Sequence, residues 1–379
     1  MRRSNPEPAV AGRSGLVDLR SPSARRARND GNGLSRLIAL LIGWVALVSA
    51  GAPQGVQPVA LDVIMGETLP RTLSEFRFFT DGIGQTPNAR VIAYDLNTPL
   101  FSDYAVKQRF VFVPEGETAR YTDEDAFDFP VGSAFIKSFG YPADFRDPDS
   151  PVRWIETRVL LRRAGGWVAL PYVWNEDGSE GVLRRAGTRL PVSWIDSGGE
   201  TQSISYRVPN QNQCKTCHLR DGAIALIGPK ARNLNNGARL AQWIDWGVLD
   251  RAPGDAPRVP VWDDSHDGTL DERARAYLDV NCAHCHSRSG SASNSGLFLG
   301  YDEQSAVARG ILKRPVAAGR GSGGLDFDIA PGHPDASILL YRMETNDPGI
   351  AMPELGREIL HREGIALIRE YVAAMPAGE

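Results

Sequence analysis

The four cysteines of this 379-residue chain fall into two copies of one short pattern, C-x-x-C-H. In each copy two residues separate the cysteines, and a histidine directly follows the second one. The first copy reads QCKTCHL and the second reads NCAHCHS. The residues are Cys214, Cys217 and His218 in the first copy, and Cys282, Cys285 and His286 in the second. Because the chain holds only six histidines, two such coincidences are not expected by chance.

This spacing has a specific chemical use. Two thiols separated in this way can add to the two vinyl groups of one haem, and the histidine that follows then ligates the iron. The sequence therefore predicts two covalently bound haem c groups, with His218 and His286 as axial ligands of the iron. His284 lies between the two cysteines of the second copy, and we expect it to point toward solvent or toward the other haem.

Three other interpretations use the same residues. In an oxidising compartment each pair could close a disulfide, but the histidines would then be incidental. A thioredoxin-like redox centre places its cysteines at the start of a helix after a strand, whereas the second pair here follows a helix-like segment. One zinc ion could take thiols from both pairs, although the 64 residues between Cys217 and Cys282 far exceed the usual spacing. Haem attachment is the favoured interpretation.

A methionine downstream of the second copy suits the sixth coordination position of its haem. Met352 precedes a proline in GIAMPELG, just before the last predicted helix. We expect Met352 to ligate the iron opposite His286, where a thioether raises the reduction potential. Met343 lies in an apolar run typical of a core, and Met375 is close to the C-terminus.

The first haem has no comparable ligand, because no methionine occurs between Met65 and Met343. The remaining candidates are His266, His333, His361, the distant Met65, or no protein ligand at all. We expect His266 and His333 in exposed loops and His361 on the polar face of the last helix. An iron that lacks a sixth protein ligand could bind small molecules, whereas a closed site can only exchange electrons.

The N-terminus carries an export pattern. A long stretch rich in Arg precedes an uncharged apolar run at 37–50, and small residues end that run. This order is typical of a secretory signal peptide, with an uncleaved anchor as the alternative. We expect a mature chain that is exported to the periplasm and has no membrane span. The net charge of −4 offers no argument for nucleic-acid binding.

Six segments rich in β-branched and aromatic residues predict strands, and four segments with helical spacing follow them. The predicted strands are 109–114, 133–139, 153–161, 166–174, 189–195 and 203–209, and the predicted helices are 238–249, 271–281, 337–343 and 356–375. Charged residues interrupt two of these strands or lie just before them, namely Asp103, Lys107, Arg109, Glu156 and Arg158. We expect most of these side chains on a solvated face, with a buried pair as the alternative.

The predicted fold class is multidomain α+β. An antiparallel β-sandwich-like N-terminal domain is followed by a helical haem-binding segment and an all-α cytochrome c domain. The predicted boundaries are a signal peptide at 1–50, a β-rich domain at 51–207, the first haem-binding segment with a Pro-rich linker at 208–262, and the cytochrome c domain at 263–379.

From residue 271 to its end the chain resembles a class I cytochrome c domain. The order of helix, C-x-x-C-H, irregular loop, Met-Pro and a last helix carrying Tyr371 is similar, as are APGHPDASILLYRM and AMPELG. The segments at 94–116, 129–139, 154–162 and 206–218 extend the resemblance to a family of exported bacterial di-haem c-type cytochromes, whose physiological role is unassigned. The resemblance implies two covalent haems, an N-terminal β domain and periplasmic electron transfer.

The expected function is therefore one-electron transfer by a periplasmic di-haem cytochrome. Segments similar to the β domain also accompany quinoprotein sugar dehydrogenases, so a periplasmic dehydrogenase is the expected redox partner. The alternative is a di-haem enzyme of peroxidase or oxidase type that uses the first haem as an open site. A third hypothesis makes the β domain a binding module for a sugar, polymer or protein. No residue is assigned a catalytic role.

Overall fold

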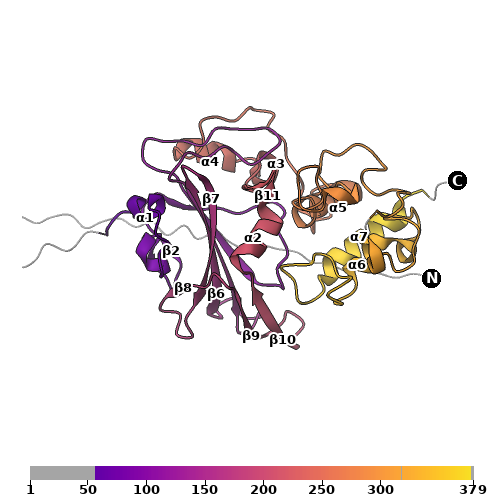
Figure 1. The fold of residues 1–379 in the computed structure, drawn as a ribbon, viewed down its shortest axis with the longest axis horizontal. Coiled ribbons are helices and arrows are strands. Elements are labelled where there is room, and N and C mark those ends of the chain that lie inside the picture. Colours follow the sequence, from indigo (N-terminus) through magenta and orange to yellow (C-terminus); the bar gives the residue numbers. More distant parts are fainter. Residues whose placement is uncertain (1–55, 317, 377–379) are drawn as a thin grey trace, which may run out of the picture. The chain divides into compact units, whose positions relative to one another are not determined.

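A six-stranded antiparallel sheet organises the structure (Figure 1), a computed structural model that describes residues 56–316 and 318–376. The predicted signal segment at 37–50 lies outside the described residues. The strands stand in chain order, and they are β3 (Val91–Ala93), β4 (Val106–Phe112), β5 (Ala134–Pro142), β6 (Val152–Arg163), β7 (Gly166–Trp174) and β8 (Gly181–Leu183). Successive strands pair as neighbours. The connection from β6 to β7 is a tight turn, whereas the segments at 94–105 and 113–133 are longer loops.

The register of the sheet separates two apolar faces. Phe110, Ile136, Val159 and Leu170 are directly opposite one another on β4 to β7, and all four are buried. They pack against α1 (Leu61–Met65) and the 3₁₀ turn η1 (Leu73–Phe76). Because side chains alternate along a strand, the next residue of each strand points to the opposite face.

That opposite face is covered by α3 (Ala231–Leu234) and α4 (Arg239–Asp245), by a β-hairpin and by α2 (Gln211–His218). Its upper row, Val111, Phe135, Leu160 and Ala169, packs against α3 and α4. Its lower end packs against the hairpin of β9 (Thr188–Ile195) and β10 (Thr201–Val208). Helix α2 lies against β7 between these two covers. The middle of this face is the part that faces the candidate site.

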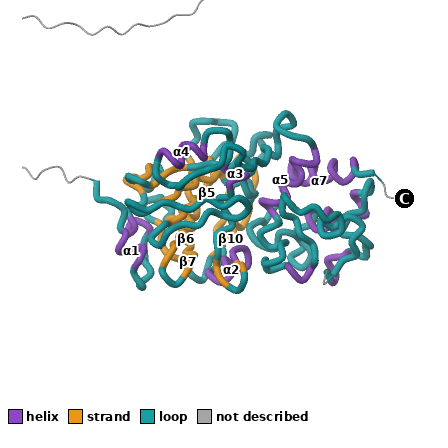
Figure 2. The backbone as a smooth tube through the Cα atoms, turned by 90° about the horizontal axis from the view of Figure 1, so that it is seen from above, coloured by secondary structure: helices purple, strands orange, loops and turns teal. Residues whose placement is uncertain are grey.

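The remaining helices follow the sheet in sequence. Helices α5 (Leu270–Asn281) and α7 (Arg362–Ala374) lie side by side (Figure 2), and α6 (Ile338–Met343) packs against α7. Their apolar faces share one core, which includes Leu278, Leu340 and Ile368. The short elements are β1 (Phe79–Asp81), β2 (Thr86–Pro87), β11 (Leu219–Arg220), β12 (Ala223–Ile224), η2 (Ser293–Ser295), η3 (Gly319–Ser322) and η4 (Pro334–Ala336).

The predicted fold class is wrong. The described chain is mostly β, with several sheets, and helix makes up only 22% of it. The C-terminal region is therefore not an all-α cytochrome c domain. Between α5 and α6 the described residues form turns, three short 3₁₀ segments and isolated bridges such as Ile311–Ile329. Many glycines in this stretch explain the difference, because glycine disfavours a helix interior.

Most individual segments were nevertheless placed correctly. The six predicted strands overlap β4, β5, β6, β7, β9 and β10, and the four predicted helices overlap α4, α5, α6 and α7. Helix α7 begins at Arg362, six residues later than the predicted start at 356. Backbone contacts join Gln54–Glu379 into one compact unit. The predicted boundaries at 207 and 262 remain predictions.

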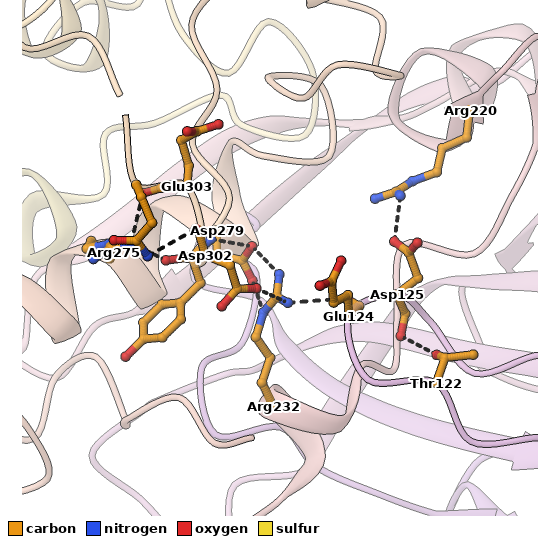
Figure 3. Close-up of polar contacts among 11 residues, drawn as sticks. Thr122, Glu124, Asp125, Arg220, Arg232, Arg275, Asp279, Asp302 and Glu303 are labelled. Carbon is orange, nitrogen blue, oxygen red and sulfur yellow. Dashed lines mark hydrogen bonds and ion pairs between the residues drawn. The ribbon is translucent and has the colours of Figure 1, made fainter. Parts of the chain in front are cut away.

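A buried ion pair joins the sheet side of the molecule to α5. The guanidinium of Arg232 on α3 donates two hydrogen bonds to the Asp279 carboxylate on α5, at 2.8 and 3.2 Å (Figure 3). Both side chains are only 5% exposed. Arg232 also donates to Asp302 and to the carbonyl oxygen of Glu124, and Asp279 accepts from the Tyr301 amide. The pair is thus fully surrounded by partners.

A second connection involves Asp103, in the loop before β4. Its carboxylate accepts hydrogen bonds from the amides of Glu358 and Ile359, at 2.6 and 3.1 Å. Burial raises the pKa of this carboxyl to about 6, although the two amides oppose the shift. Asp103 therefore ties the loop that precedes α7 to the sheet, contrary to the solvated position expected from the sequence.

Among the residues that the structure describes, no helix combines the length and the apolar character needed to cross a membrane.

Removing one partner of the Arg232–Asp279 pair should be strongly destabilising. Asp279→Asn leaves the Arg232 charge buried, and we expect a loss of about 3–5 kcal/mol in the free energy of unfolding, measured by urea denaturation. As the control, Arg314→Gln breaks an ion pair with Asp326 whose side chains are 75% and 73% exposed. Its loss should stay within about 1 kcal/mol. Equal losses of unfolding free energy in the two variants would show that the buried pair stabilises the structure no more than the exposed pair does.

Candidate functional site

Both C-x-x-C-H copies line one cavity of about 630 Å³. The cavity is bounded by the middle of the sheet face, α2, the end of α5 and the loop before α7, and its volume falls within the range of small-molecule and cofactor sites. The lining includes every site residue predicted from the sequence: Cys214, Cys217, His218, Cys282, Cys285, His286 and Met352. The fold thus brings together residues that lie far apart in the chain.

Helix α2 presents the first motif to the cavity. The helix begins with a capping box, in which the side chains of Asn210 and Gln213 each accept a hydrogen bond from the other residue's amide. Cys214, Cys217 and His218 are spaced by three and four residues, so they share one face of the helix. That common face explains why all three side chains reach the same cavity.

The chain directly after α2 orients the His218 ring. Strands β11 and β12 form a tight hairpin that returns Ala225 to His218, where the Ala225 amide donates to the His218 carbonyl oxygen at 2.8 Å. His218 Nδ1 lies 2.9 Å from the Ala225 carbonyl oxygen. Burial lowers the pKa of His218 to about 4, so the imidazole is neutral at neutral pH. Its proton is therefore on Nδ1, and the Nε2 lone pair is free for a metal ligand bond.

The second motif follows the end of α5. Cys282 caps the helix, and the amides of Cys285 and His286 both donate to the Cys282 carbonyl oxygen, at 3.1 and 2.9 Å. His286 Nδ1 lies 3.3 Å from Ser295 Oγ. Burial lowers the pKa of His286 as well, so this imidazole is also neutral at neutral pH. Both histidines therefore have an Nδ1 partner in the surrounding chain, as iron-ligating histidines do.

The two motifs meet at a Cys–His–Cys cluster. One ligand atom each from Cys217, His284 and Cys285 lie within 4.8 Å of one another. Cys285 Sγ also lies 3.6 Å from the Thr216 carbonyl oxygen. His284 is buried, and its Nδ1 has no hydrogen-bond partner. The expectation of a solvent-facing side chain is therefore wrong. His284 lies next to Cys217 of the other motif, and its direction relative to a haem stays a prediction.

The thiols differ in acidity because their surroundings differ. Hydrogen bonds donated by Cys217 and His284 lower the pKa of the Cys285 thiol. Burial raises the pKa of Cys282 to about 12 and also raises that of Cys214. The cluster therefore favours a thiolate at Cys285, whereas the thiols outside it stay protonated at neutral pH.

The predicted sixth ligands occupy different environments. Met352 lines the cavity, and its amide donates to the Arg342 carbonyl oxygen at 2.9 Å. Met343 also reaches the cavity but is buried in the core around α7. Met65 is 42% exposed on α1 and is not part of the lining. Among the described residues, the structure thus leaves Met352 as the partly exposed methionine of the cavity wall.

The three histidines considered for the first haem differ in whether they line the cavity. His266 and His333 are exposed and do not line the cavity, as expected. His361 lines it, but the expected position on the polar face of the last helix is wrong. His361 precedes α7, is only 9% exposed and stacks on Phe101 at 4.0 Å. Its Nδ1 is 2.9 Å from the Tyr277 hydroxyl, so an aromatic cluster holds the ring.

The donor set fits covalent haem. Four thiols and two neutral imidazoles with free Nε2 atoms line a cavity of cofactor size, together with the apolar residues Leu297, Leu299 and Ile338. Cys217 and Cys285 would each supply one thioether, Cys214 and Cys282 the others, and the imidazoles would ligate iron. Sequence inspection missed the Ala225 carbonyl, since only the hairpin geometry brings it to His218.

Comparison with known proteins adds no relative: no family model, no curated protein and no solved structure matches this chain.

The Cys–His–Cys cluster should bind a soft divalent ion when haem is not attached, because thiolate and imidazole are preferred zinc ligands. We expect full-length chain produced without haem attachment to bind about one zinc ion, measured by elemental analysis after dialysis. Cys217→Ser should remove most of that zinc. Cys214→Ser is the matched control and should retain it, because Cys214 lies outside the cluster. Equal zinc loss in both variants would instead place the ion on the first C-x-x-C pair.

Proposed function

We propose that this protein is a periplasmic di-haem c-type cytochrome that transfers single electrons. The observation that carries the proposal is the shared cavity, into which both C-x-x-C-H copies project their cysteines and histidines. The resemblance of the sequence to exported di-haem cytochromes supports the same function. When bound, each haem would supply one-electron cycling between ferric and ferrous iron.

The chain's own residues would set the properties of each haem. Ala225 holds the His218 ring in the tautomer that leaves Nε2 free, and Ser295 is the partner of His286. Met352 is the candidate sixth ligand on the side of the second motif. Because both cysteine pairs line one cavity, the two haems would be neighbours. An electron could then pass directly from one haem to the other, with no layer of packed side chains between them. A periplasmic dehydrogenase is the proposed electron donor.

Attachment of two haems is the first test. The chain produced together with haem-attachment machinery should carry two covalent haems, measured by intact mass and by haem absorbance of denatured protein. Replacing Cys214 and Cys217 by Ala should leave one haem, and so should replacing Cys282 and Cys285. His284→Ala is the control that should keep both, because His284 is not an attachment residue. Loss of all haem on acid–acetone extraction would refute the proposal.

The same preparation discriminates between electron transfer and enzymatic function. Low-spin ferric signals from both haems, without turnover of peroxide, agree with the proposed cytochrome. A high-spin signal accompanied by peroxide turnover would favour the di-haem enzyme instead, with the first haem as the open site.

Met352→Ala should lower the midpoint potential of one haem, because loss of the thioether removes a ligand that favours ferrous iron. A spectroscopic redox titration measures this change. Met343→Leu is the matched control: it alters another methionine of the cavity wall but keeps an apolar side chain of similar size. An unchanged titration in Met352→Ala would exclude Met352 as a ligand.

A further inference from the structure

Three cations stand side by side on the sheet face that lines the cavity. Arg109 on β4 is directly opposite Lys137 on β5, and Lys137 is directly opposite Arg158 on β6. All three contribute to the cavity wall. We call them the cationic row. Like charges directly opposite one another destabilise a sheet, so this arrangement is costly unless something compensates it.

Among the described residues, only one end of the cationic row has a hydrogen-bonded carboxylate partner. Arg158 donates two hydrogen bonds to the Glu156 carboxylate, both at 2.8 Å. Glu156 is completely buried and also accepts from the Tyr206 hydroxyl at 3.0 Å. The sequence suggested solvated positions for Glu156 and Arg158, and the structure shows the buried pair instead.

Arg109 and Lys137 have no such partner among the described residues. Arg109 is 6% exposed, and its Nη2 atom is buried without a hydrogen bond. Within the same part of the chain, the Lys137 amine makes no hydrogen bond or ion pair. Burial lowers the pKa of Lys137 well below its ordinary value, and the charges of Arg109, Lys107 and Arg158 add to the effect. These two side chains are therefore short of negative charge.

The carboxylates on the cavity wall do not supply that charge. Asp279 is paired with Arg232, and Asp328 is paired with Lys313 at 2.9 Å. Glu354 acts on Arg342, on the C-terminal side of the cavity. Away from that wall, the charge of Asp95 acts on Arg109, and the charge of Glu156 acts on Lys137. Neither carboxylate forms a hydrogen bond with these two side chains among the described residues, so a ligand that enters the cavity can supply the negative charge that contacts both. Buried cations are normally paired, and guanidinium groups suit planar carboxylates in particular.

We propose that Arg109 and Lys137 form a carboxylate-binding site inside the cavity. Two sources share this chemistry: the propionate groups of a haem attached at Cys214 and Cys217, or a free carboxylate that enters the cavity. The first source rests on the proposed function, and the second does not. The charges of Lys137 and Arg158 act on His218, so the cationic row lies near the first motif.

The test uses the haem-loaded, full-length protein and two measurements. Succinate is the free-carboxylate probe, and its binding is measured by calorimetry at low salt. Potentiometry then measures the midpoint potentials of the haems between about pH 5 and pH 8. The variants are Arg109→Gln and Lys137→Gln, with Lys137→Arg as the charge-conserving variant. Arg153→Gln is the matched control, because Arg153 is an exposed cation of the same strand as Arg158.

If haem propionates occupy the site, wild-type protein does not bind succinate, and its potentials vary little with pH. In Arg109→Gln and Lys137→Gln, one potential should then become pH-dependent, because a propionate without its cations titrates in this range. Lys137→Arg should restore the wild-type profile, and Arg153→Gln should not change it. A general change in packing would not produce this dependence on charge.

If a free carboxylate occupies the site, wild-type protein binds succinate, and each Gln variant weakens binding by about tenfold or more. If protein produced with the haem-attachment machinery carries no covalent haem at Cys214 and Cys217 but binds succinate, the proposed function is refuted and this site is kept. The carboxylate site itself is overturned if succinate does not bind and all variants share the wild-type pH profile. Circular dichroism confirms folding, and Lys137→Gln should unfold at a higher temperature than wild type when no anion is bound.

Discussion

The buried ion pair between Arg232 and Asp279 is the constraint on which the candidate site depends. It fixes α5 to the sheet side of the molecule three residues before Cys282, so the second C-x-x-C-H motif is delivered to the cavity that already contains the first. Both charges are desolvated, so removing either partner would leave an uncompensated buried charge. Asp103 likewise fixes the loop before α7 to the sheet, through the hydrogen bond that its carboxylate accepts from the Glu358 amide. Together, this contact and the ion pair close the cavity on its C-terminal side.

The sheet that supports the site is divided into regions with opposite properties. One face is apolar throughout its centre and packs on α1 and η1, which supplies the stability of the unit. On the other face, three cations lie directly opposite one another on adjacent strands. A face that only packed against other protein segments would be expected to carry aliphatic side chains at these positions. Local conflict of this kind is expected at functional sites, since the surrounding structure must hold it in place.

How much could be predicted from the sequence differs by the type of signal. The strands were predictable because β-branched and aromatic runs are local. The spacing of C-x-x-C-H singled out residues that the structure places around one cavity, and haem attachment there stays a prediction. The fold class was predicted wrongly, because the resemblance to an all-α domain was given more weight than the irregular loop expected between the helices. The environments of His361 and Glu156 depend on contacts with residues far away in the sequence. A local sequence pattern gives no information about such contacts. The cationic row needed the strand register, since Lys137 lies in SAFIKSF without any sign of its neighbours.

The hairpin after α2 has a consequence for the order in which the two sites can form. His218 and the carbonyl oxygen that orients its ring are seven residues apart, so closing that loop costs little entropy. The proposed second site draws on α5, on the chain near Ser295 and, as candidate ligand, on Met352, so it would not be complete until most of the polypeptide is present. During synthesis from the N-terminus, the first imidazole can therefore be set in place by its own short segment, well before its counterpart exists.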